Sequence, residues 1–142
     1  MFVEPLTLVI VDGHDRARTA LAERLQRLAG VLVLAAVGEI GLAIEVVGRL
    51  KPDVVLLEPR TGDSSPLATL WRLVGIGPPV VILTSSLAEG EAEGFMRAGA
   101  YAALVKDTDV LGLLRRIRLA IGAQETRSNH PPPNAAPPST PP

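Results

Sequence analysis

The sequence contains no cysteine, which excludes disulfide bonds, thiolate metal sites and redox chemistry through thiols. Its formal net charge is only -1, so it offers no concentration of positive charge with which to bind nucleic acid. Apolar stretches such as VLVLAAV at 31–37 are far shorter than the roughly 20 residues that cross a bilayer. Residues 1–12 lack the basic start and the cleavage site of a signal peptide. We therefore expect a cytoplasmic protein that binds neither membrane nor nucleic acid directly.

What is present points to one globular domain and a tail. Hydrophobic residues make up 47% and charged residues 20% of the 142 residues, which is typical of a soluble chain with a single core. The apolar periodicity stops at Gly122, and a proline-rich sequence ending in SNHPPPNAAPPSTPP follows, which cannot build a core. We predict a domain over residues 1–122, with Gly122 at the end of its last helix, and a disordered tail or linker over residues 123–142.

Five short runs of aliphatic and β-branched residues predict strands. They lie at 6–12, 31–37, 53–58, 79–84 and 101–106. Because these runs are apolar at nearly every position, they are typical of parallel strands that are covered on both faces. Segments with helical apolar spacing lie between and after the strands, which predicts five helices. The alternation indicates an α/β domain with a doubly wound parallel sheet and helices on both faces.

Each expected helix has an apolar stripe that should face the core. The stripes are Leu21, Leu25 and Leu28; Leu42, Val46 and Leu50; Leu67, Leu70 and Val74; Phe95 and Met96; and Val110, Leu113, Leu114, Ile117 and Ile121. Asp107 or Thr108 is expected to cap the last helix. The fourth segment contains Gly90 and Gly94, and each glycine disfavours a helix by about 1 kcal/mol relative to alanine. We therefore expect the fourth helix to be the least stable element.

Polar residues stand where four of the expected strands end. They are Asp12, followed by Gly13; Glu58; Thr84, followed by Ser85; and Lys106. Because ligands of open parallel sheets bind beyond the carboxyl ends of the strands, we expect these side chains to meet at one edge. The chain has neither a nucleophile next to a base nor a nucleotide-binding fingerprint, which argues against an enzyme.

Four stretches around these residues occur in a recognisable order. VDGH ends the first strand, KPDVVLLEPR contains the third, VVILTS contains the fourth and RAGAYAALVKD contains the fifth. Together they resemble the receiver domain of bacterial two-component response regulators, in particular the nitrate-response and LuxR-type class, over about residues 6–122. The resemblance implies a flavodoxin-like, five-stranded sheet of order 2-1-3-4-5 with five helices, and a role in phosphorelay signalling and transcription regulation.

The resemblance also implies a phosphoacceptor aspartate, a Mg²⁺ ion held by acids of the first and third strands, a phosphate-binding hydroxyl and a lysine. Asp12, Thr84 and Lys106 match these positions. Gly13 stands where the second acid of the first strand belongs, and Glu58 stands where the phosphoacceptor belongs. The chain therefore resembles a receiver whose phosphorylation site is altered.

A further departure concerns the switch position. The aromatic residue that the resemblance implies three positions before Lys106 is replaced by Ala103. Tyr101 lies two residues earlier, and the period of two in a strand predicts that it shares a face with Ala103.

These departures predict a pocket that no longer accepts phosphate. Mg²⁺ requires near-octahedral oxygen coordination, so we expect its binding to be weak or absent, with Asp12 and Glu58 as the ligands if there are any. We expect no other cofactor. Glu58 should instead reach toward Thr84 and Lys106, which places a permanent negative charge near the position of the missing phosphoryl group.

We predict an atypical receiver domain that is not phosphorylated and acts through protein contacts. The resemblance implies that these contacts, with a protein partner or in a homodimer, involve the fourth helix, fifth strand and fifth helix, or else the first and fifth helices. It also allows for a DNA-binding domain beyond residue 142. Two alternatives remain open: a receiver that accepts phosphate on Glu58 or a nearby side chain, and a sensor that binds a small ligand in the vacated pocket.

Overall fold

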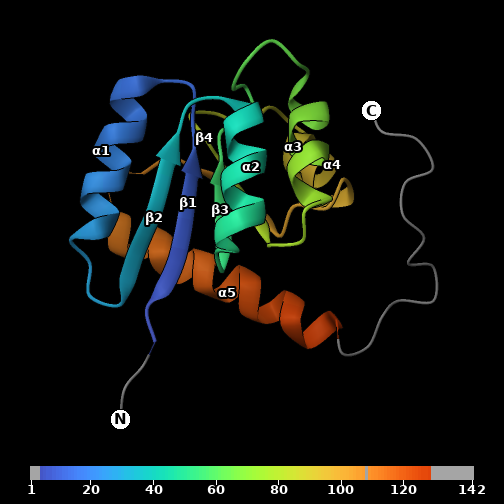
Figure 1. Ribbon diagram of the computed structural model, residues 1–142. Helices are drawn as coiled ribbons and strands as arrows, with labels where there is room; N and C mark the ends of the chain where they lie inside the picture. Colours follow the sequence, from blue (N-terminus) through green and yellow to red (C-terminus); the bar gives the residue numbers. More distant parts are fainter. Residues whose placement is uncertain (1–3, 108, 129–142) are drawn as a thin grey trace.

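The computed structural model describes residues 4–107 and 109–128, in which strands and helices alternate (Figure 1). The strands are β1 (Leu6–Val11), β2 (Val31–Val37), β3 (Val54–Leu57), β4 (Val80–Thr84) and β5 (Ala102–Val105). The helices are α1 (Asp15–Gln26), α2 (Ile40–Leu50), α3 (Pro66–Val74), α4 (Glu91–Arg97) and α5 (Val110–Ser128). All strand pairs are parallel and their order is β2-β1-β3-β4-β5. The predicted doubly wound sheet and its order are confirmed.

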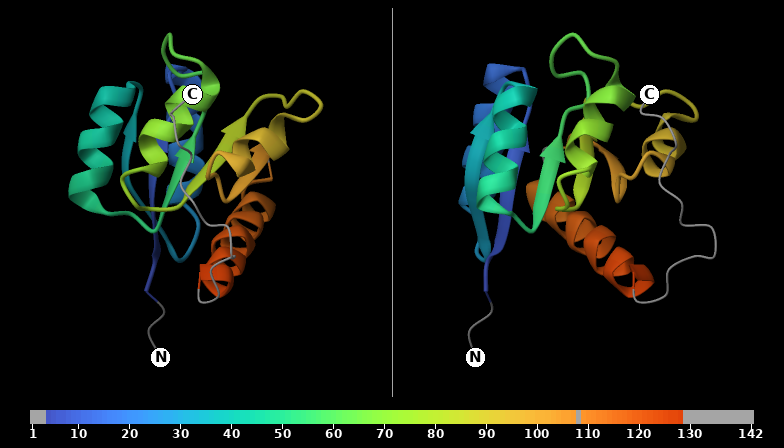
Figure 2. Two further views of the ribbon diagram at one scale, coloured as in Figure 1. Left: turned by 90° about the vertical axis from the view of Figure 1, so that its right-hand side faces the viewer. Right: turned by 45° about the vertical axis from the view of Figure 1, so that its right-hand side comes forward.

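The sheet separates two hydrophobic cores, and helices cover both (Figure 2). Helices α2, α3 and α4 pack on one face of the sheet, and we call the buried residues between them and the sheet the α2–α4 core. Helices α1 and α5 pack on the other face and enclose the α1–α5 core. Successive side chains of a strand point to opposite faces, so Val9 belongs to the α2–α4 core and Leu8 and Ile10 belong to the α1–α5 core. This double burial explains why the strands are apolar at nearly every position.

The inward faces of α2 and α3 differ from the predicted stripes. In α2, Leu42 and Leu50 are 46% and 38% exposed, whereas Ala43 and Val47 are fully buried. At the start of α3, Leu67 is 38% exposed, and in α4 Met96 is 45% exposed. The predictions for α2 and α3 were wrong because both helices carry more apolar residues than one face can bury, so spacing alone did not determine which of them turn inward. The prediction for Met96 was wrong because it is adjacent to the buried Phe95, and adjacent residues of a helix do not share a face.

The N-terminal end of α5 also differs from the prediction. The helix begins at Val110, and the carboxylate of Asp109 accepts a hydrogen bond from the backbone N–H of Gly112 at 2.9 Å. Asp109 is therefore the capping residue. Asp107 instead accepts a hydrogen bond from the backbone N–H of Asp109, and the other predicted cap, Thr108, lies outside the described residues.

The C-terminal end of α5 lies beyond the predicted one. The helix passes through Gly122 and continues to Ser128, so the helix end predicted at Gly122 is wrong and residues 123–128 are helical. The rest of the predicted proline-rich tail, residues 129–142, lies outside the described residues. Within the part of the chain that the structure describes, no helix is both long enough and apolar enough to cross a membrane.

Two glycines at α4 lead to opposite predictions. Gly94 lies inside this seven-residue helix, with open space where a Cβ would stand, whereas Gly90 precedes the helix with a left-handed φ of 82°. Gly94→Ala should raise the free energy of unfolding by about 1 kcal/mol, because alanine loses less backbone entropy in a helix. Gly90→Ala should lower it by about 1–2 kcal/mol, because a side chain disfavours a positive φ.

Chemical denaturation of both variants measures these changes. Hydrogen exchange should in addition be faster in residues 87–97 than in α1, because α4 buries little apolar surface besides Phe95. Destabilisation by Gly94→Ala, or slower exchange in residues 87–97 than in α1, would contradict this view of α4.

Candidate functional site at the carboxyl edge of the sheet

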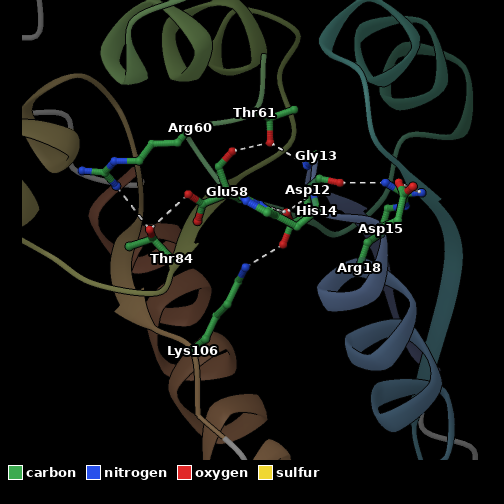
Figure 3. A network of polar contacts seen from close by, with 10 residues as sticks. All are labelled: Asp12, Gly13, His14, Asp15, Arg18, Glu58, Arg60, Thr61, Thr84 and Lys106. Carbon is green, nitrogen blue, oxygen red and sulfur yellow. Dashed lines mark hydrogen bonds and ion pairs between the residues drawn. The ribbon is translucent and has the colours of Figure 1, made fainter. Parts of the chain in front are cut away.

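The predicted strand-end residues meet because sheet pairing continues one residue beyond three of the strands. The backbone N–H of Asp12 donates to the last carbonyl of β2 at 3.0 Å. The N–H groups of Glu58 and Lys106 donate in the same way to the last carbonyls of β1 and β4, each at 2.8 Å. These bonds fix where each side chain leaves the sheet. We call Asp12, Glu58, Thr84 and Lys106 the strand-end cluster (Figure 3).

The carboxylate of Asp12 is fully engaged within this cluster. Lys106 Nζ donates to Asp12 Oδ2 at 2.6 Å, and the backbone N–H of His14 donates to Asp12 Oδ1 at 2.9 Å. The Asp12 side chain is only 3% exposed and that of Lys106 is 24% exposed. Because a buried carboxylate without a partner is strongly destabilising, Lys106 is needed to hold Asp12 in this position.

Glu58 contacts Thr84 but not Lys106. The hydroxyl of Thr84 donates to Glu58 Oε1 at 3.2 Å, as predicted. The predicted contact between Glu58 and Lys106 is wrong, because the ammonium group is paired with Asp12. Glu58 is 5% exposed, and its second oxygen, Oε2, is buried without a hydrogen-bond partner among the described residues.

The sequence analysis did not identify Arg60, which lies two residues after Glu58 in the loop that follows β3. Arg60 Nη1 donates to the hydroxyl of Thr84 at 3.3 Å, and Nη2 donates to Glu91 Oε2 at 2.7 Å. The signal that could have revealed it is a basic residue just beyond a strand-end acid, in the loop where binding residues of such sheets gather. The hydroxyl of Thr84 therefore lies between one acidic side chain, that of Glu58, and one basic side chain, that of Arg60.

Thr61 is a second residue that the sequence analysis did not identify. Its hydroxyl donates to the carbonyl of Glu58 at 2.7 Å and accepts from the backbone N–H of Gly13 at 3.0 Å, and the residue is 1% exposed. It therefore ties the end of β3 to the end of β1. A Cβ on Gly13 would lie 3.5 Å from Thr61 Cγ2, which is ordinary van der Waals contact. Packing thus leaves room for a side chain at position 13.

The remaining predicted positions lie at the margin of the cluster. Ser85 follows Thr84 but is exposed, and its side chain makes no hydrogen bond to another described residue. Ala103 lies in β5 and packs against the α2–α4 core. Tyr101 packs against the α1–α5 core, so the prediction that it shares a face with Ala103 is wrong. The strand begins only at Ala102, and its alternation does not extend back through the preceding turn.

The cluster offers few ligands for a metal ion. Within residues 4–107 and 109–128, no group of three or more histidine, aspartate or glutamate side chains is placed to hold one. Asp12 and Glu58 are the two carboxylates of the strand-end cluster, and Asp12 already accepts bonds at both oxygens.

No protein-family model matches the chain. It is 35% identical over 116 residues to the nitrate/nitrite response regulator protein NarP of Escherichia coli, a match that covers 80% of this chain and 54% of NarP. It is 34% identical over 94 residues to a protein-glutamate methylesterase/protein-glutamine glutaminase of Xanthomonas oryzae, covering 66% of this chain and 26% of that enzyme. The chain thus spans about half the length of NarP and about a quarter of the methylesterase.

Solved structures share the fold over nearly their full length. The signal receiver domain of a modulated diguanylate cyclase from Desulfovibrio desulfuricans superposes with a TM-score of 0.74 at 25% identity, covering 87% of this chain and 99% of that one. A DNA-binding response regulator of the LuxR family from Staphylococcus aureus gives a TM-score of 0.71 at 19% identity, covering 82% and 98%. The sheet order, the strand-end motifs and these relatives agree, and the chain belongs to the receiver-domain family of response regulators.

Proposed function

We propose that this receiver domain works in two-component signalling as an unphosphorylated module that acts through protein contacts. The observation that carries the proposal is Glu58, which occupies the phosphoacceptor position, is buried, and is bonded to the hydroxyl of Thr84. The similarity of the chain to NarP supports a role in transcription regulation and a location in the cytoplasm.

The residues at the site do not suit the Mg²⁺ ion that the family implies. Mg²⁺ demands near-octahedral oxygen coordination at about 2.0–2.1 Å. Gly13 contributes no side-chain oxygen, and an ion at Asp12 would have to displace the ammonium group of Lys106. In the strand-end cluster, Oε2 of Glu58 is the one carboxylate oxygen without a hydrogen bond, so nearly the whole shell would have to come from water and backbone oxygens.

The chemistry of Glu58 supports the same conclusion. Its extra methylene moves the carboxylate by roughly 1.5 Å relative to an aspartate, and phosphoryl transfer depends on in-line positioning and on charge neutralisation by a metal. A carboxylate carries one negative charge, whereas a phosphoryl group carries about -1.5 to -2 and three acceptor oxygens. Glu58 therefore supplies a fixed charge at the end of β3 without reproducing the phosphorylated state.

The contact surface that we propose comprises α4, β5 and α5. These elements carry four large apolar side chains that are 43–72% exposed: Met96, Val105, Leu111 and Leu119. The occupant is a second copy of the chain or a different protein, and α1 with α5 is the other candidate face for a dimer. The greater length of NarP and the DNA-binding relative from S. aureus support a DNA-binding domain beyond residue 142.

A small-ligand sensor is the second candidate function. It is favoured by Glu58 Oε2, a buried acceptor without a partner among the described residues, because a ligand with a hydrogen-bond donor would satisfy it. Thermal stabilisation of the wild-type protein by a small molecule, lost in Glu58→Ala, would favour this candidate.

Rebuilding the acidic site tests the main proposal. Glu58→Asp alone should not restore Mg²⁺ binding, because position 13 still offers no side chain. The double variant Gly13→Asp with Glu58→Asp should be less stable than wild type by about 1–3 kcal/mol without metal, because three carboxylates then share Lys106. Millimolar Mg²⁺ should recover that loss, since a ligand that binds only the folded state adds about 2.7 kcal/mol at 100 times its dissociation constant.

Thermal melting of each variant with and without Mg²⁺ provides the measurement. The matched control is Gly13→Asn with Glu58→Asp, which adds a side chain of the same size without the second charge. It should show a much smaller response to Mg²⁺ than the double aspartate variant. If wild-type protein responds to Mg²⁺ as strongly as the double aspartate variant, the native site already holds the ion and the proposal fails.

A further inference from the structure

The guanidinium group of Arg60 contacts Thr84 of the strand-end cluster (Figure 3) and Glu91 of α4. One of its nitrogens donates to the hydroxyl of Thr84, which in turn donates to Glu58. The other donates to Oε2 of Glu91, a residue in the first turn of α4. A continuous line of hydrogen bonds thus leads from the carboxylate of Glu58 to α4.

The direction of each hydrogen bond in this line is fixed by chemistry. A guanidinium group can only donate, and an ionised carboxylate can only accept. The hydroxyl of Thr84 therefore accepts from Arg60 and donates to Glu58, and no other assignment satisfies all three groups. Loss of the charge on Glu58 weakens the hydrogen bond that its oxygen accepts from Thr84, because bonds to an ionised acceptor are shorter and stronger, and this changes the geometry available to Arg60.

The line reaches both the helix and the loop before it. While Glu91 Oε2 accepts from Arg60, Glu91 Oε1 accepts from the backbone N–H of Ala88 at 2.8 Å. Arg60 is 43% exposed and Glu91 is 26% exposed, so water competes only in part for this pair. Helix α4 is seven residues long and buries Phe95 alone, so the ion pair with Arg60 adds to a small number of buried contacts.

We propose that Arg60 is a positioning residue that couples the carboxylate of Glu58 to residues 85–97, the loop before α4 and α4 itself. Through this line of hydrogen bonds, the carboxylate of Glu58 helps to hold the α4 surface that a partner meets. This inference rests on the proposed function, in which α4 is part of the contact surface. Ala103 cannot make such a link, because its side chain ends at Cβ against the α2–α4 core.

Amide chemical shifts measured by NMR test the coupling directly. Glu58→Gln removes the charge and keeps the shape of the side chain. It should shift the amide signals of residues 85–97 in the otherwise wild-type chain. In an Arg60→Met background the same change should shift those signals at least threefold less, while signals of residues 57–61 move in both backgrounds.

Two further variants separate the role of the guanidinium fork from that of its charge. Arg60→Lys keeps the charge, but a single ammonium group cannot hold Thr84 and Glu91 in one fixed geometry, so it should behave like Arg60→Met. Arg72→Met changes an exposed arginine in α3 and should leave the coupling intact. Thr84→Val removes the middle hydroxyl and should abolish the coupling even where Arg60 is present.

Two results would overturn the inference. One is a shift of residues 85–97 that is equally large in the Arg60→Met background, because the coupling would then take another route. The other is the lack of any such shift in the wild-type background. Neither readout depends on Mg²⁺ or phosphate, so a failure here leaves the proposal of an unphosphorylated receiver standing. A magnesium-dependent wild type would likewise leave the coupling measurement intact.

Discussion

The ion pair between Lys106 and Asp12 determines what the rest of the strand-end cluster can do. It joins the ends of β5 and β1, which are separated in the sheet by β3 and β4, so it spans the positions of Glu58 and Thr84. Each oxygen of Asp12 accepts a hydrogen bond, one from Lys106 and one from the backbone N–H of His14, so a cation at Asp12 would compete with the ammonium group. Among the described residues, the carboxylate of Glu58 has one side-chain partner, Thr84.

Thr84, Arg60 and Glu91 form a second set of contacts on the other side of Glu58. Lys106 makes no contact with Glu58, and Arg60 is linked to Glu58 through the hydroxyl of Thr84. Arg60 in turn is held by Glu91 on α4. Polar groups thus converge at the carboxyl edge of the sheet, and their pairing links the end of β3 to α4.

The sequence was sufficient to predict the parts of this structure that depend on backbone periodicity. The five strands are found within one residue of their expected ends, and Asp12, Glu58, Thr84 and Lys106 meet as expected, because parallel strand ends share one edge. It did not predict which carboxylate Lys106 would choose, since that depends on side-chain reach across two strands. Arg60 was missed because its contacts depend on the path of the loop after β3, and the inward face of α2 was missed because its sequence is apolar on too many sides.

The most direct test of an unphosphorylated receiver is the intact mass of the wild-type protein after incubation with acetyl phosphate and Mg²⁺. The double variant Gly13→Asp with Glu58→Asp serves as the positive control under the same conditions. Because the nucleophile is displaced and Asp12 is held by Lys106, the wild-type mass should remain unchanged. An adduct of about 80 Da, the mass of one phosphoryl group, localised to Glu58 would contradict the account.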